Sequence, residues 1–200
     1  MPFREPFKPT KLRLRHLLRG EVEAELRPAR ADDAVIWEQD WQPALRLHAR
    51  PDGEWPWRSH VARAESEVGY LSLAVARDGV VDALMSLTET RETSRLDPGR
   101  TVVYVEFVGI APKHQAPPVG ERTIKGLGRL MLEIAAQISI TTGGNGRIGL
   151  HAKPDVEDFY RTLRLHECAN EPCEDGTWRY FETCAFWLRG ENLRQGRVAT

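Results

Sequence analysis

The chain has 200 residues, of which 41% are hydrophobic and 28% are charged, and its formal net charge at pH 7 is −1. These values are ordinary for one globular domain, and they exclude the strongly basic balance that most nucleic-acid-binding proteins show. Because no apolar run approaches the roughly 20 residues of a membrane span and no secretory signal pattern opens the chain, we expect a cytoplasmic protein with neither a membrane nor a nucleic-acid partner.

The first 20 residues are expected to form an N-terminal extension with local positive charge. Basic side chains alternate there with leucines, as in the run from Lys11 to Arg19. Two interpretations stay open, namely a solvated or docking arm and an arm that binds an acidic partner. Residues 21–190 would form the folded domain, and residues 191–200 a C-terminal tail.

The first half of the domain predicts a strand, a helix and a hairpin. Residues 22–26 alternate as a strand does, and Asp32 or Asp33 is expected to cap a helix that runs through Asp40. Residues 50–60 are expected to form a loop rich in Pro, Gly and Trp. Two apolar runs then flank Arg77-Asp78-Gly79, and Asp-Gly is typical of the type I′ turn of a hairpin.

The second half predicts a long strand followed by alternating helices and strands. Residues 101–111 are nearly all β-branched, aromatic or apolar, as expected of a strand that is buried on both faces. Helical spacing predicts a helix over 126–142, and a glycine pair ends it. A strand over 147–152, a helix that Pro154 opens, and a final strand and short helix over 178–190 complete one mixed α/β domain.

Two glycines stand where the 126–142 helix begins. Gly126 and Gly128 flank Leu127, so an anion can approach the unpaired N–H groups of the first helical turn without obstruction by side chains. Lys125 and Arg129 add positive charge beside them. The pattern therefore predicts a pyrophosphate cradle, with tight helix packing as the alternative reason for the glycines.

Three segments together resemble the Gcn5-related N-acetyltransferases, the GNAT superfamily: residues 108–112, 126–131 and 159–163. The resemblance covers roughly residues 22–188 and is sharpest over 101–165. The family signature, Gln/Arg-x-x-Gly-x-Gly/Ala, falls on residues 123–128, where Thr123 departs from it. An insertion over 113–122 precedes the signature.

The resemblance implies a GNAT-like mixed sheet, mostly antiparallel, with helices on both faces and a splayed strand pair. The strands 101–111 and 147–152 would separate, and the pantothenate arm of acetyl-coenzyme A would pair with the backbone of Val108, Gly109 and Ile110. The pyrophosphate would lie on the N–H groups from Lys125 to Arg129.

The implied reaction passes the acetyl group directly from the thioester to an amine, without an acyl-enzyme. The implied partners are acetyl-coenzyme A as co-substrate and an amine on a small molecule, a peptide or a protein, and a homodimer is left open. No metal is expected, because Cys168, Cys173 and His166 lack a fourth ligand at suitable spacing, and residues 169–176 read as an acidic loop.

Two proton transfers are needed, because an amine with a pKa of about 10.4 must be deprotonated before attack and the thiolate needs an acid. Tyr160 matches the tyrosine that the family uses as acid; the alternative is a core residue. Glu106 lies in an apolar run on the face of Val108 and Ile110, and is the first candidate base. Its alternatives are an anchor for the substrate and a structural partner of an arginine.

His151, at the end of the neighbouring strand, is the second candidate base, and a structural histidine is its alternative. A different class of function also stays open. The departure at Thr123 and the insertion over 113–122 are compatible with a GNAT-like module that binds an acyl-coenzyme A or a protein partner without turnover.

Overall fold

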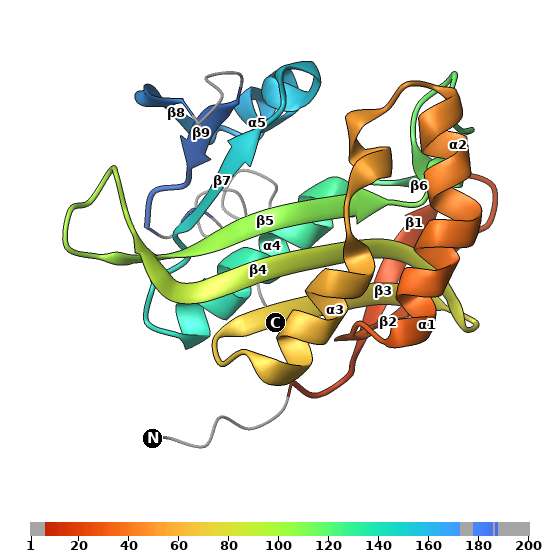
Figure 1. Cartoon of the computed structure of the whole chain (residues 1–200), viewed down its shortest axis with the longest axis horizontal. Coiled ribbons are helices and arrows are strands. Elements are labelled where there is room, and N and C mark those ends of the chain that lie inside the picture. The colour runs from red at the N-terminus through yellow and green to blue at the C-terminus, as the bar shows by residue number, and fades with distance from the viewer. Residues whose placement is uncertain (1–6, 173–177, 186, 188–200) are drawn as a thin grey trace. The chain divides into compact units, whose positions relative to one another are not determined.

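The computed structural model describes residues 7–172, 178–185 and 187 (Figure 1). By their contacts the residues group into two compact units. The first unit comprises Met1–Ser86 and Phe107–Gly128, and the second comprises Leu87–Glu106 and Arg129–Thr200. Elements that pass from one unit into the other are strands β4 (Val80–Thr93) and β5 (Thr101–Ile110) and helix α4 (Leu127–Thr141).

Strands of the first unit pair in the order β6-β1-β2-β3-β4. They are β1 (Thr10–His16), β2 (Gly20–Pro28), β3 (Tyr70–Arg77), β6 (Ile124–Lys125) and the start of β4. The expected hairpin between β3 and β4 is confirmed. Its turn residues Asp78 and Gly79 both have positive φ, 49° and 79°, as a type I′ turn requires.

Strand β1 occupies the segment that we expected to form an N-terminal extension. It pairs along its whole length with β2, and its end pairs with β6. Leu14 is buried, whereas Arg13 and Arg15 are exposed, which is the alternation of a strand with one buried face. Lys11, Arg13 and Arg15 therefore lie on a paired strand and not on a solvated arm.

Helical segments follow β2 in the first unit: α1 (Ala31–Ile36), a π-helical turn (Trp37–Trp41), α2 (Gln42–Leu47), a 3₁₀ turn (Pro51–Glu54) and α3 (Trp57–Ser66). The helix expected through Asp40 is present. Asp33 lies in its first turn and not at its cap, and Oδ2 of Asp33 accepts the N–H of Arg30 at 2.7 Å.

The loop expected over 50–60 is wrong in its second half, because Trp57 begins helix α3. Proline and tryptophan made this segment look irregular. Pro56 directly precedes the helix, however, and there the missing N–H of proline breaks no helical hydrogen bond.

Tryptophan side chains form the centre of the first unit. Trp37 and Trp57 are 0% and 1% exposed, and their ring centroids lie 5.5 Å apart. A Cβ on Gly109 of β5 would lie 2.7 Å from Cζ3 of Trp37 and 3.2 Å from Cζ2 of Trp57. Position 109 therefore requires glycine, because the two indole rings approach the strand too closely for a side chain.

A buried carboxylate on β4 fixes the loop that follows β5. Asp82 is 0% exposed. Its carboxylate binds Nε of Arg77 at 2.5 Å, Nζ of Lys113 at 3.0 Å and Nε2 of His114 at 2.7 Å. Burial alone would raise the pKa of Asp82, but the bonds from His114, Arg77 and Lys113 outweigh it and hold that pKa well below its usual range.

Strands of the second unit pair in the order β5-β7-β9-β8. The further elements of this unit are β7 (Ile148–Ala152), a 3₁₀ turn (Pro154–Val156), α5 (Glu157–Thr162), β8 (His166–Pro172) and β9 (Arg179–Glu182). β5 and β7 are parallel, whereas β1 with β2, β1 with β6, β2 with β3, β7 with β9 and β8 with β9 are antiparallel. The sheet is therefore mixed and mostly antiparallel, as expected.

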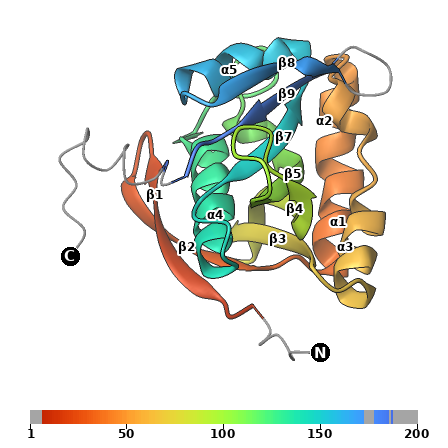
Figure 2. The same ribbon diagram turned by 90° about the vertical axis from the view of Figure 1, so that its left-hand side faces the viewer.

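Strand β8 takes the place of the first part of the acidic loop that we expected over 169–176, and residues 173–176 of that loop lie outside the described residues. The strand lies beside β9 (Figure 2) and pairs with it in antiparallel register. The register is irregular between Cys168 and Pro172. Because the segment lacks an alternating apolar pattern, its pairing with β9 and not its own composition makes it a strand. The short helix expected after the final strand falls mostly outside the described residues.

Helix α4 confirms the helix predicted from apolar spacing. Met131, Leu132, Ala135 and Ala136 are all buried. Gly143, which follows the helix, has a φ of 88°, the left-handed conformation that commonly ends a helix.

Replacing Gly109 with alanine should destabilise the protein, because the new methyl group would overlap the ring of Trp37. Overpacking of this kind typically costs about 1–3 kcal/mol of unfolding free energy, which urea denaturation measures. In the double variant with Trp37→Phe, the smaller ring should relieve part of the overlap, so its loss should be less than the sum of the two single losses. An unchanged denaturation midpoint for Gly109→Ala would contradict the close approach.

Asp82→Asn should cost about 1.5–3 kcal/mol at pH 7, because it removes the charged acceptor of the hydrogen bonds from Arg77 and Lys113, whose own charges still reach solvent. The depressed pKa of Asp82 also sets a pH dependence. Its stabilising contribution is present above the unfolded pKa of about 3.9 and is lost as the pH falls toward the folded value. Melting temperatures at pH 7 and pH 3 should therefore differ less for Asp82→Asn than for the wild type. The control is Asp78→Asn, an exposed position of the same hairpin whose positive φ asparagine tolerates.

Candidate functional site

Strand β5 carries candidate residues on one face. We expected burial on both faces, and the structure corrects this. Val103, Val105 and Gly109 are buried, whereas Tyr104, Glu106, Val108 and Ile110 on the alternate face are half-buried. The strand therefore presents a partly accessible row of side chains in which Glu106 is the carboxylate.

Pairing between β5 and β7 is short. The ladder runs from Val103 opposite Ile148 to Val105 opposite Leu150, although β5 continues to Ile110 and β7 to Ala152. Continued by one residue, this register would place Glu106 opposite His151. The two candidate bases thus stand at the first position beyond the ladder, where the predicted splayed strand pair begins.

The glycine segment of the first unit joins β6 to α4. Lys125 pairs with Arg15 of β1, so the N-terminal strand supports this segment. Gly126 is exposed and has a φ of 83°, and a Cβ placed on it would meet no atom within 4 Å. Leu127 begins α4 and is buried. The backbone at the start of the helix is therefore open to an approaching group on the side of Gly126.

Arg129, in the first turn of α4, belongs to the second unit. Its Nε donates to Oε1 of Glu133 at 2.8 Å, so the carboxylate of Glu133, one turn along the helix, partly neutralises its positive charge. Lys125, by contrast, is exposed.

The insertion over 113–122 is tied to both neighbouring segments of the first unit. Nε2 of Gln115 donates to the carbonyl oxygen of Ile110 at 2.8 Å. Nδ1 of His114 lies 2.6 Å from Oγ1 of Thr123, the residue at which the sequence departs from the GNAT signature. No motif in the sequence points to His114, and only its contact with buried Asp82 reveals its role.

His151 of β7 is flanked by two tyrosines in the second unit. Its Nδ1 lies 2.7 Å from Oη of Tyr104. The ring of Tyr180 lies 5.2 Å from it, and the Tyr180 hydroxyl donates to Oε2 of Glu182 at 3.1 Å. Burial, and next the negative charge of Glu182, raise the pKa of Tyr180 far above its usual value.

Tyr160 lies on α5, and its ring packs against Phe159 and Phe181 at centroid distances of 5.3 and 5.7 Å. Burial, with a smaller effect of Asp155, raises the pKa of Tyr160 to about 12. The phenol is therefore protonated at neutral pH. Its hydroxyl has no hydrogen bond to any residue that the structure describes.

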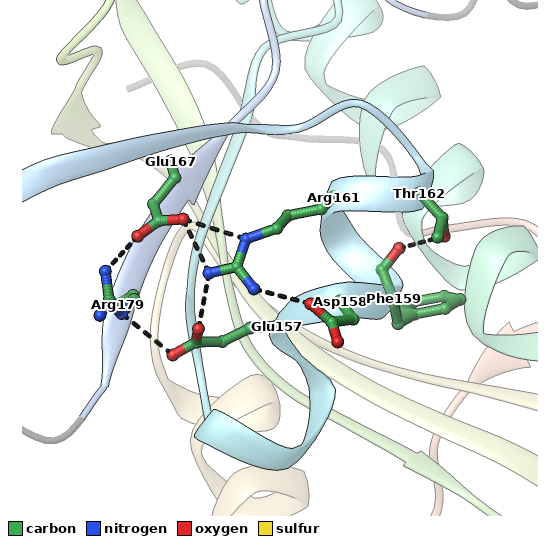
Figure 3. A network of polar contacts seen from close by, with 7 residues as sticks. All are labelled: Glu157, Asp158, Phe159, Arg161, Thr162, Glu167 and Arg179. Carbon is green, nitrogen blue, oxygen red and sulfur yellow. Dashed lines mark hydrogen bonds and ion pairs between the residues drawn. The ribbon is translucent and has the colours of Figure 1, made fainter.

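A network of ion pairs attaches α5 to the β8–β9 hairpin (Figure 3). Arg161 binds Glu157 at 2.7 Å, Asp158 at 2.8 Å and Glu167 at 2.8 Å. Arg179 of β9 binds both Glu157 and Glu167. Because Arg161 directly follows Tyr160, this network holds the helical turn that carries the candidate acid.

Metal-binding groups and membrane-spanning helices can be assessed for the described residues. Within them, no group of three or more His, Cys, Asp or Glu side chains is arranged to hold a metal ion. None of the helices in residues 7–172, 178–185 and 187 is long and apolar enough to cross a membrane. Cys184 has a free thiol, and Cys173 lies outside the described residues.

No protein-family model matches the chain, and no curated protein matches it. Among solved structures, an uncharacterized protein from Bacillus halodurans aligns with a TM-score of 0.64 at 10% identity, covering 97% of this chain and 100% of that one. The GNAT domain of S. lividans PAT gives 0.57 at 17% identity, over 88% and 96%. PaiA N-acetyltransferase from Thermoplasma acidophilum, solved with coenzyme A, gives 0.56 at 12% identity, over 81% and 99%. The chain therefore has the fold of the GNAT acetyltransferases.

Proposed function

We propose that this chain is an N-acetyltransferase that moves an acetyl group directly from acetyl-coenzyme A to a primary amine. The observation that carries the proposal is the open backbone at Gly126, where α4 begins. The first turn of a helix presents unpaired N–H groups and the positive end of the helix dipole, which together favour a phosphate. A solved structure of the same fold with bound coenzyme A supports this choice of ligand.

In this proposal the backbone from Lys125 to Arg129, through Gly126, Leu127 and Gly128, binds the pyrophosphate. The pantothenate arm pairs with the end of β5, at Val108, Gly109 and Ile110, which lie beyond the ladder that the described residues of β5 and β7 form. The carbonyl of Ile110 already accepts Nε2 of Gln115, but a carbonyl oxygen has two lone pairs and can take a second donor.

Acetyl transfer needs a proton acceptor for the amine and a proton donor for the thiolate. We assign the acceptor to Glu106, with His151 as the second candidate, and the donor to Tyr160. With its pKa raised to about 12, the phenol of Tyr160 is protonated at neutral pH and can donate a hydrogen bond to the thiolate as it forms. The remaining acceleration would come from holding thioester and amine in contact, which is worth several powers of ten in related reactions.

A module that binds acyl-coenzyme A without turnover is the second candidate function. The observation that favours it is Thr123, which stands where the family signature has Gln or Arg and whose side chain is engaged by His114. Because the Thr123 side chain anchors the loop over 113–122, it would not make the polar contact to the cofactor that the Gln or Arg of the signature makes.

Acetyl-coenzyme A should raise the melting temperature of the wild type, because a ligand that binds only the folded state stabilises it. At 100 times the dissociation constant the gain is about 2.7 kcal/mol, or roughly 5–10 °C for a chain of this size.

Gly126→Ala should reduce the affinity for acetyl-coenzyme A about tenfold or more, because its methyl group would obstruct the open backbone at the start of α4.

The matched control is Gly143→Ala at the other end of α4. Gly143 also has a positive φ and open space around it, so both variants carry the same backbone strain of about 1–2 kcal/mol. Equal ligand-induced shifts in the two variants would contradict the proposed phosphate site, and no shift in the wild type would contradict cofactor binding altogether.

Glu106→Gln and Tyr160→Phe should each lower kcat/KM for acetyl transfer about 10²–10⁴-fold while preserving the shift with acetyl-coenzyme A. Turnover is measured as release of the coenzyme A thiol with a panel of small amines, peptide N-termini and lysine peptides. Glu65→Gln, an exposed carboxylate on α3, is the control and should leave turnover unchanged. Unchanged turnover in both site variants would refute their roles, and cofactor binding without acetylation of any amine would favour the second candidate function.

A further inference from the structure

Tyr104 of β5 makes a close polar contact with the candidate histidine. Its Oη lies 2.7 Å from Nδ1 of His151. Tyr104 is opposite Gly149 in the parallel ladder, so His151, two residues further along β7, lies on the same face of the sheet. Glu106, two residues after Tyr104, shares that face. All these residues belong to the second unit.

Tyr180 of β9 packs beside the same imidazole, but its hydroxyl donates its hydrogen bond to a different residue. It is opposite His151 in the antiparallel ladder, with the ring centroids 5.2 Å apart. Its hydroxyl is committed to Glu182, a buried carboxylate that also accepts the hydroxyl of Ser94 and the backbone N–H of Arg95. A carboxylate only accepts hydrogen bonds, so the direction of the Tyr180 bond is fixed.

The direction of the bond between Tyr104 and His151 follows from the chemistry of the two groups. The free nitrogen of an imidazole is far more basic than a neutral phenolic oxygen, because its protonated form has an ordinary pKa of about 6.5. A phenol, with an ordinary pKa of about 10, is also a more acidic donor than the N–H of a neutral imidazole. The phenol therefore donates its proton to Nδ1 and the imidazole accepts. Since a neutral imidazole carries one N–H, its own proton lies on Nε2.

We infer that Tyr104 is a positioning residue that holds His151 in the tautomer protonated at Nε2, so that His151 is a hydrogen-bond donor and not the proton acceptor of the site. The basic nitrogen, Nδ1, is covered by the phenol, and Nε2 has no lone pair to receive a proton. The consequence for catalysis rests on the proposed function. Glu106 takes the proton of the acceptor amine, and Nε2–H of His151 donates to an oxygen acceptor, a carboxylate or the carbonyl of the thioester.

The test is the ¹⁵N spectrum of His151 in the full chain, labelled at histidine and measured at a pH where this imidazole is neutral. The signals are assigned by their loss in His151→Gln. The wild type should show an unprotonated Nδ1 that accepts a hydrogen bond and a protonated Nε2. In Tyr104→Phe the Nδ1 signal should move to the position of a nitrogen without that bond.

Tyr180→Phe is the matched control, because it also removes one hydroxyl from a ring that packs on His151. It should leave the Nδ1 signal where the wild type has it. A proton on Nδ1 in the wild type, or the same Nδ1 signal in Tyr104→Phe, would overturn the inference. The spectrum is read without acetyl-coenzyme A or turnover, so its outcome is independent of whether the protein acetylates an amine.

Discussion

The buried carboxylate of Asp82 fixes the position of the loop that precedes α4. The charge of Asp82 must be met inside the protein, and two of its partners, Lys113 and His114, begin the insertion over 113–122. His114 in turn contacts Thr123, directly before β6 and three residues before Gly126. An unpaired buried charge would cost several kcal/mol, so the loop is held on β4. The open helix start thus depends on a chain of polar contacts that originates in the β3–β4 hairpin.

Sequence patterns within a segment predicted the elements whose conformation depends on neighbouring residues. The Asp78-Gly79 turn, the apolar run of β5 and the spacing of α4 each specify a conformation without help from distant residues. Strand β1 alternates basic residues with leucines, but its local positive charge suggested an extension, and strand β8 has no alternating apolar pattern. Both segments are strands because β2 and β9 pair with them. Helix α3 was not predicted because Pro56 before it and the tryptophans at 55 and 57 suggested a loop, whereas Trp57 begins the helix and is buried in the core.

The same distinction applies to the candidate site, where some residues have a local sequence signal and others are placed only by packing or strand pairing. Gly126 could be singled out because glycine before a helix has a meaning in sequence, and the structure adds the open space around it. Gly109 was expected to serve the cofactor through its backbone, whereas its lack of a side chain is explained by the ring of Trp37. Tyr104 could not be found, because its contact with His151 depends on the register between β5 and β7. β5 and β7 are parallel strands with helix α4 between them in the chain, so no turn sequence fixes their register.

Identity of 10–17% to structures of the same fold shows how little of the sequence the fold requires. A fold needs its apolar pattern and a few close approaches, whereas a reaction needs particular groups at particular atoms. For this reason, the departure at Thr123 weighs less than its place in the signature suggests. Backbone N–H groups bind a phosphate whatever side chain stands three residues earlier, and the exposed charge of Lys125 remains beside them. Loss of the glycine at 126 would be the more serious departure, because its φ of 83° gives the backbone a path that other residues rarely adopt.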